Sequence, residues 1–202
     1  MTIPSTHPHI AHWMPYFFGD SLEAIAKAKA SGFAYIDQDC HITKDGVPVI
    51  KHWSKVRMDG FTYILDSHGK RVKHNLGRDI QIGDLDFETL SRLRQASGDY
   101  RYRRIIDHMH ECKRQGITMC LEVKGDKAFE DPAIMHRIKH AQEAVGASVY
   151  VMTLQNIGHP LGRLRAAKQA GFETALLPRN AQPLDWDKNW SPYVDAVWGK
   201  WR

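Results

Sequence analysis

Acidic side chains at the ends of two β-prone runs are the first candidates for chemistry. In YIDQDCHITKDGVPVIKHW, residues 35–53, Asp37 and Asp39 lie two positions apart. Glu122 and Lys124 repeat this spacing in ITMCLEVK. Residues two apart on a strand point to the same face, so each pair projects together. Three carboxylates that face one space repel each other unless a cation or protons intervene.

A hard divalent cation is the natural partner of such a group, because oxygen ligands suit Mg²⁺ and Ca²⁺. Asp37, Asp39 and Glu122 are therefore the predicted ligands of one divalent cation. A D-x-D pattern alone is weak, and the alternative remains that these are solvated strand-end acids, each paired with a nearby lysine or arginine.

Two histidines, His12 and His52, each end a predicted strand, where an acid and a base would lie. Histidine is suited to proton transfer near neutral pH. With a cation and Lys124 to neutralise phosphate oxygens, these histidines would suit cleavage of a phosphodiester. The other histidines are interpreted as surface or packed side chains. His108 and His110 do not share a helix face, so they make a poor metal clip.

The elements that must position these residues alternate between strands and helices. Apolar spacing and capping residues predict helices over residues 19–33, 87–96, 102–116, 130–146 and 159–172. Strands are predicted over residues 7–13, 34–39, 47–53, 117–124, 147–154, 173–178 and 194–199. Asp20 or Ser21 can cap the first helix, and Asp86 the second. Residues 54–85 fit either a hairpin or a long functional loop.

This alternation favours a parallel sheet covered by helices, either an open doubly wound sheet or a closed barrel. No glycine-rich phosphate loop follows a strand, which disfavours the dinucleotide-binding type. A barrel would bring the polar strand ends to one rim, where barrel active sites form. We therefore expect a single (β/α)8 TIM-barrel-like domain over residues 1–202. A full barrel needs roughly 250 residues, so this one is expected to be shortened or incomplete at the C-terminus.

Composition and charge limit the classes of protein and of binding partner that fit this sequence. The 202 residues suffice for one substantial core. No apolar run is long enough for a membrane span, and MTIPSTHPHIAHW has no features of a secretion signal, so a cytoplasmic location is expected. The net charge of +5 suits anionic partners. No nucleic-acid-binding motif accompanies the basic residues, so no nucleic-acid partner is expected. Cys40, Cys112 and Cys120 are predicted to be free, buried thiols.

The order of these motifs resembles the glycerophosphodiester phosphodiesterase family. The resemblance rests on IAH in the first strand, then G-F-x-Y-I-D-x-D-x-x-x-T-K-D-G-V-P-V-I-x-H, DLDFETL and LEVK. It is clear over residues 9–53 and 84–124 and looser over residues 147–178. Family members without a secretion signal occur in bacteria and bacteriophages, so the resemblance is compatible with either origin.

The resemblance implies a role for each motif residue. His12 and His52 match the two catalytic histidines, and Lys124 matches the lysine near the phosphate. Asp37 takes the place of a metal-binding Glu, whereas Asp39 and Glu122 match the other two metal ligands. The implied fold is a (β/α) barrel with a small insertion at about residues 54–85. In the implied reaction a neighbouring substrate hydroxyl attacks phosphorus, and water opens the cyclic phosphate. The implied metal is Mg²⁺ or Ca²⁺.

Several positions depart from the family pattern. Trp13 replaces an arginine that grips phosphate, and an indole cannot supply its bidentate fork. Trp53 replaces an aspartate, and FFGDS replaces PENT before the first helix. We expect a metal-dependent phosphodiesterase that hydrolyses a small glycerol-type phosphodiester to an alcohol and glycerol phosphate. The alternatives are a catalytically impaired binding or structural module, a phospholipase D-like lyase that stops at the cyclic phosphate, and an unrelated α/β enzyme.

Four tryptophans lie in the C-terminal segment of the sequence: Trp186, Trp190, Trp198 and Trp201. Exposed together they would form a large apolar patch. We therefore expect them to cover the barrel or to form a contact between copies in a homo-oligomer.

Overall fold

The computed structural model describes most of the chain between residues 17 and 197. The described residues are 17–52, 54–56, 63–65, 71–73, 80–94, 101–124, 127–154, 159–177 and 191–197. The predicted strand over residues 7–13, with His12 and Trp13, lies outside them, as do Trp53 and the four C-terminal tryptophans.

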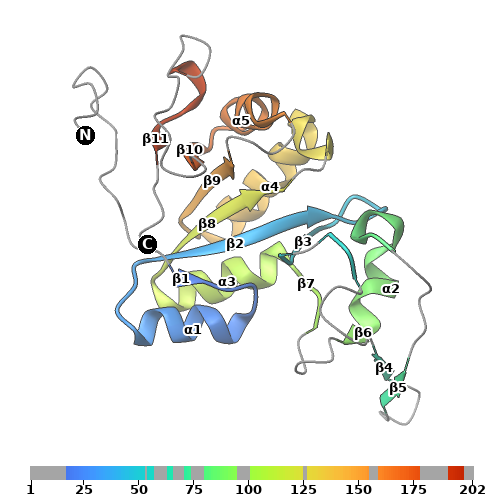
Figure 1. Ribbon diagram of the computed structural model, residues 1–202. Coiled ribbons are helices and arrows are strands. Elements are labelled where there is room, and N and C mark those ends of the chain that lie inside the picture. Colours follow the sequence, from blue (N-terminus) through green and yellow to red (C-terminus); the bar gives the residue numbers. More distant parts are fainter. Residues whose placement is uncertain are drawn as a thin grey trace.

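One large sheet forms the centre of the structure (Figure 1). Its main parallel strands are β2 (Tyr35–Ile42), β8 (Thr118–Val123), β9 (Val149–Leu154) and β10 (Glu173–Leu177). The short strands β1 (Phe17–Phe18) and β11 (Ala196–Val197) pair in parallel with β2 and β10. Since β2 pairs directly with β8, the two segments that carry the predicted site residues are neighbours.

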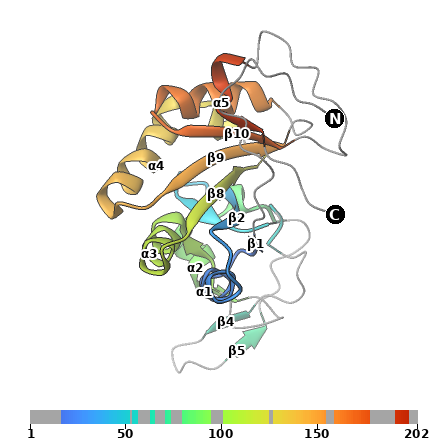
Figure 2. The same ribbon diagram turned by 90° about the vertical axis from the view of Figure 1, so that its left-hand side faces the viewer.

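Helices connect the parallel strands and cover one side of the sheet. They are α1 (Leu22–Ala30), α3 (Ile105–Gln115), α4 (Pro132–Val145) and α5 (Pro160–Gln169). Figures 1 and 2 show them following one another along the curved sheet, and successive helices are in contact. The strand–helix alternation predicted from the sequence is confirmed. Within the described ranges the barrel is not closed, because β11 and β7 (Arg103–Arg104) lie at the two ends of the strand order and do not pair with each other.

An antiparallel hairpin branches from the second half of β2. Strand β3 (Pro48–Ile50) pairs with it in the register Cys40↔Ile50. The hairpin turn also holds α2 (Phe87–Arg92), because the backbone N–H of Phe87 donates to Asp45 Oδ1 at 3.0 Å. Asp86 occupies the predicted N-cap position of this helix, but its side chain makes no capping bond. A carboxylate distant in sequence takes that place.

A second, small sheet lies beside the hairpin. It contains β4 (Tyr63–Leu65), β5 (Arg71–Lys73) and β6 (Leu93–Arg94), paired in the order β5-β4-β6. The 3₁₀ helix η1 (Ile82–Asp84) precedes α2, and two further 3₁₀ turns, η2 (Lys127–Glu130) and η3 (Ser191–Tyr193), precede α4 and β11. A separate buried cluster supports this region: Val49, Val56, Ile82, Leu90, Leu93 and Tyr102.

The main core lies between the sheet and the helices. Ile36 and Leu121 of the sheet share one buried cluster with Ile25, Met109 and Met135 of the helices. Burial of such side chains is the main driving force for folding. All three cysteines of the chain are buried and none forms a disulfide, as predicted. No helix in the described ranges is long and apolar enough to cross a membrane.

The other face of the sheet is apolar near its strand starts and polar toward its strand ends. Cys120, Met152 and Ala175 pack there in a cluster of their own. On the same face of β2 and β8 lie Asp37, Asp39 and Glu122, by the two-residue alternation of a strand; Asp37 is in register with Cys120, and Glu122 with Met152. The apolar cluster therefore forms a base on which the acidic residues lie.

Candidate active site

Three buried carboxylates meet where β2 and β8 run side by side. Asp39 is paired with Glu122 across the two strands, and Asp37 lies two residues before Asp39 on the same face. Their exposed fractions are small: 2% for Asp37, 0% for Asp39 and 4% for Glu122. One oxygen atom from each carboxylate lies within 4.8 Å of the other two. The predicted convergence of these acids is present in the structure.

Lys124 supplies a positive charge beside this group. Its Nζ lies 2.7 Å from Asp39 Oδ1 and 2.6 Å from Glu122 Oε1. Burial disfavours the charged amine, but the two carboxylates outweigh burial and raise the Lys124 pKa above its usual value. Lys124 is therefore a charged ammonium group at neutral pH.

His52 reaches Asp39 from the end of the hairpin. The backbone N–H of Lys51 donates to the Asp39 carbonyl at 2.7 Å, which aligns the two segments. The His52 imidazole then bonds to Asp39 Oδ2 through Nδ1. This bond raises the His52 pKa, against the smaller opposing effect of burial. The side chain of His52 remains 35% exposed, so the ring is partly accessible to solvent.

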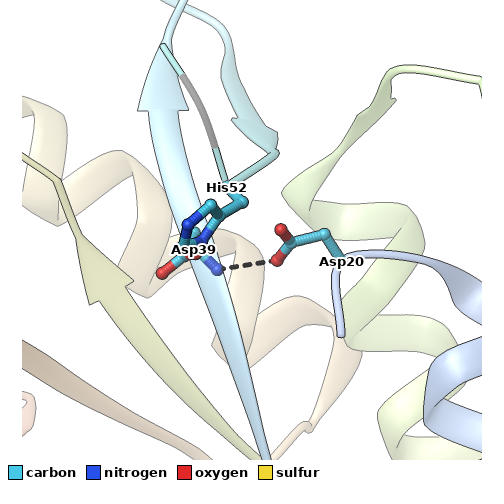
Figure 3. Close-up of side chains that lie close together, drawn as sticks. All are labelled: Asp20, Asp39 and His52. Carbon is cyan, nitrogen blue, oxygen red and sulfur yellow. Dashed lines mark hydrogen bonds and ion pairs between the residues drawn. The ribbon is translucent and has the colours of Figure 1, made fainter. Parts of the chain in front are cut away.

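Asp20 is a further acidic residue at this place (Figure 3). It lies between β1 and α1, and its Oδ1 accepts a hydrogen bond from the backbone N–H of Asp39 at 3.0 Å. Burial, and then the charge of Asp39, raise the Asp20 pKa to about 7, although the bond from the Asp39 backbone and the charges of Lys51 and His52 oppose the shift. Of the two predicted caps of α1, Ser21 makes the capping bond, to the backbone N–H of Ala24.

Sequence reasoning missed Asp20 as a site residue because its type and position also fit a helix cap. A usable signal exists, however. Asp20 follows the apolar pair Phe17–Phe18, so it is a polar residue at the end of a parallel strand. The same rule identified Asp37, Asp39 and Glu122.

The donor set fits a hard divalent cation. Burial raises the Asp37 pKa well above its usual value, and the charges of Asp39 and Glu122 raise it further. Within the described part of the chain, Asp37 Oδ1 is buried without a hydrogen-bond partner. Such an oxygen atom is costly to bury unless something compensates it. A divalent cation bound by Asp37, Asp39 and Glu122 would use this oxygen and offset the repulsion.

The structure thus brings together five of the six predicted site residues: Asp37, Asp39, His52, Glu122 and Lys124. His12 lies outside the described residues, and so do the neighbouring Trp13 and Trp53. The arrangement joins an imidazole, an ammonium group and a carboxylate cluster. The chemical role of each residue stays a prediction.

Comparison with known proteins gives an independent view of this fold and site. The family model described as "Glycerophosphoryl diester phosphodiesterase family" matches residues 13–111. The matched part includes Asp20, Asp37, Asp39 and His52, whereas Glu122 and Lys124 follow it. A search of curated protein sequences found no match.

Several solved structures are similar. A phosphodiesterase of Oleispira antarctica in complex with the product sn-glycerol-3-phosphate is 14% identical, with a TM-score of 0.67, over 91% of this chain and 72% of that one. A protein of Silicibacter pomeroyi DSS-3 named as a glycerophosphoryl diester phosphodiesterase is 18% identical (TM-score 0.58; 85% and 65% covered). A glycerophosphodiester phosphodiesterase of Parabacteroides distasonis is 13% identical (TM-score 0.56; 82% and 66% covered).

These similarities concern the fold. The chain spans just under two thirds of the length of the Silicibacter and Parabacteroides proteins. The predicted TIM-barrel-like class is confirmed, with the barrel open within the described residues. The family model matches just under half of the chain, and both this match and the shared fold agree with the resemblance found in the motifs, so the chain is similar to the glycerophosphoryl diester phosphodiesterase family in sequence motifs and in fold.

Proposed function

We propose that the protein is a metal-dependent phosphodiesterase that hydrolyses a glycerol-type phosphodiester to an alcohol and glycerol phosphate. The observation that carries this proposal is the buried Asp37–Asp39–Glu122 cluster with His52 and Lys124 bonded to its central member. The match of residues 13–111 to the glycerophosphoryl diester phosphodiesterase family model supports it. The similar Oleispira protein, which was solved with sn-glycerol-3-phosphate as its product, supports the substrate class.

In this proposal Asp37, Asp39 and Glu122 hold one divalent cation, Mg²⁺ or Ca²⁺. When bound, the cation polarises the phosphoryl group and offsets its charge. Lys124 adds a second positive charge for a phosphate oxygen, and the two carboxylates beside it keep it protonated. The cation and the Lys124 ammonium together balance the three carboxylates, so the phosphodiester would meet two positive centres rather than unopposed negative charge.

His52 acts as a general acid or base in this proposal. Because Asp39 Oδ2 accepts the proton of Nδ1, the ring presents Nε2 to the substrate. A hydrogen-bonded carboxylate fixes the tautomer and the orientation of a catalytic imidazole. The raised pKa favours the protonated ring, which suits donation of a proton to the leaving alcohol. His12 would be the partner that takes a proton from the attacking hydroxyl.

The test is an activity assay on the purified protein. Glycerophosphocholine, glycerophosphoethanolamine and bis(p-nitrophenyl) phosphate are incubated with the protein in Mg²⁺, in Ca²⁺ and in EDTA. We expect metal-dependent release of product that is lost in His52→Ala and in Glu122→Gln. The matched control is His136→Ala, an exposed histidine of α4 outside the site, which should retain full activity.

Two results would contradict the proposal. Absence of turnover on every diester with either metal indicates a binding or structural module. A cyclic phosphate that persists as the final product in phosphorus NMR spectra indicates a lyase, because hydrolysis requires water to open that ester.

A further inference from the structure

The face of β2 turned away from the site carries a polar side chain inside the main core. Gln38 is completely buried. Because side chains alternate along a strand, its neighbours Asp37 and Asp39 point to the site, whereas Gln38 points toward the helices. Ile36 and Cys40 on the same face belong to the main apolar cluster. Burial of an amide in such surroundings is unfavourable unless its hydrogen bonds are made.

Both ends of the Gln38 amide have partners distant in sequence. Its Nε2 donates to the carbonyl of Gly19 at 3.0 Å. Its Oε1 lies 3.1 Å from Nδ1 of His108 on α3. Because a carbonyl oxygen only accepts, His108 must carry its proton on Nδ1 for this bond. The amide therefore links α3 to the turn before α1.

His108 behaves as a permanent donor. It is 1% exposed. Burial, with a smaller effect of the charge of Arg103, lowers its pKa to about 3. The ring is thus uncharged at neutral pH, which suits a hydrogen-bond donor rather than a group that transfers protons. What it can supply is a fixed N–H toward Gln38.

The Gly19–Asp20 turn is held against β2 at three points. The Gly19 carbonyl accepts from Gln38, and the Gly19 N–H donates to the Asp37 carbonyl at 3.2 Å. The third point is the bond from the Asp39 N–H to Asp20 Oδ1 (Figure 3). His108 and Asp20 also line the same small cavity, which shows that the helix side of this network reaches the turn itself.

We propose that Gln38 and His108 are positioning residues of the candidate active site. Through Gly19 they fix the turn that presents the Asp20 carboxylate to the Asp39 backbone and to His52. The catalytic consequence rests on the proposed function, whereas the placement of Asp20 does not. Neither residue contacts substrate in this proposal; both act through Asp20.

The experiment compares two substitutions of His108, one that keeps an N–H donor and one that removes it. His108→Asn keeps an N–H close to the position of Nδ1, whereas His108→Leu has a similar volume and no donor. Hydrogen exchange of the Asp39 amide, measured by NMR with Mg²⁺ present, reports directly on the Asp20–Asp39 bond. Steady-state kinetics on the best diester report on the site.

We expect His108→Leu to speed exchange at the Asp39 amide by about tenfold and to lower kcat by a similar factor, with little change in KM. His108→Asn should restore most of both. Met135→Ala, a cavity variant in the buried part of α4, is the control for general destabilisation. It should leave kcat unchanged and should not single out the Asp39 amide.

The outcomes separate the two proposals. If exchange at Asp39 in His108→Leu equals that in Met135→Ala, the positioning role is wrong. If the wild-type protein shows no phosphodiesterase activity, the proposed function fails, and the exchange result still decides the positioning role. If His108→Leu does not fold, Gln38→Met removes both bonds with an apolar side chain of similar length, and it must then speed exchange at Asp39.

Discussion

The titration of Asp20 predicts a specific loss of stability with rising pH. The pKa of this carboxyl is raised from 3.8 to about 7 in the folded protein, first by burial and then by Asp39. Between these two values the folded protein retains a proton that the unfolded chain has lost. Stability must therefore fall as pH rises through this window, by about 1.4 kcal/mol per pH unit for one group.

The magnitude can be isolated with Asp20→Asn. The amide keeps an oxygen acceptor for the Asp39 N–H but has no ionisable group. Between pH 5 and 7 the wild-type protein should lose about 2 kcal/mol relative to this variant, because the slope already falls as pH approaches the folded pKa. Above the folded pKa the difference should level off, because both states are then ionised.

Other titratable groups also make stability depend on pH, either in the same direction as Asp20 or outside the pH range between its two pKa values. The raised pKa of His52 contributes stability that is present below its usual value of 6.5 and is lost as pH rises through the folded value. Asp45 and Asp195 have lowered pKa values, so their contributions change below pH 4. Since these groups are common to wild type and variant, the difference between the two proteins reports mainly on Asp20.

The assay is urea unfolding of both proteins at half-unit steps from pH 5 to pH 8 in EDTA. The chelator is needed because a cation near Asp39 would favour the ionised carboxylate. Parallel curves for wild type and Asp20→Asn would refute the reasoning, since they would mean that Asp20 titrates equally in both states. A wild-type protein that gains stability over the variant as pH rises would refute the sign.

Three further predictions concern single side chains. Lys124→Met leaves the buried carboxylates of the site without their ammonium partner and should lower the free energy of unfolding in EDTA by about 3 kcal/mol; unchanged urea unfolding would contradict the ion pairs. Glu122→Gln should weaken binding of Mg²⁺ or Ca²⁺ about tenfold or more in isothermal titration calorimetry, whereas His136→Ala should bind as wild type does. Asp45→Ala should cost about 1 kcal/mol by removing the hydrogen bond at the start of α2, and Asp86→Ala should cost much less in the same unfolding assay.

The sequence was most informative where a strand ends in polar residues. Asp37 and Asp39, like Glu122 and Lys124, could be placed on one face because the strand period is two. The two pairs could be expected to meet because parallel strands end at a common rim. The direct pairing of Asp39 with Glu122 was beyond prediction, since register depends on how β2 and β8 pack rather than on either segment alone.

Long-range hydrogen bonds account for most of what the sequence could not reveal. Asp20 has a neighbour, Ser21, that serves equally well as a helix cap, and only the folded chain shows which of them turns to Asp39. His108 is a packed helical histidine, as predicted, yet its partner Gln38 lies seventy positions earlier in the chain. Local rules also favour Asp86 as a cap and cannot reveal that Asp45 approaches the same helix.

The hairpin that joins β2 to β3 divides the assembly of the site into two stages. His52 and Asp39 are only thirteen positions apart and belong to one hairpin, so their contact costs little chain entropy and can form early. Glu122 and Lys124 arrive from a distant strand, and their contacts with Asp39 close a much longer loop. The imidazole–carboxylate pair can thus exist in a partly folded chain, whereas the Asp37–Asp39–Glu122 cluster is complete only after β8 has docked. If the proposed function holds, a cation could bind there only once β8 is in place.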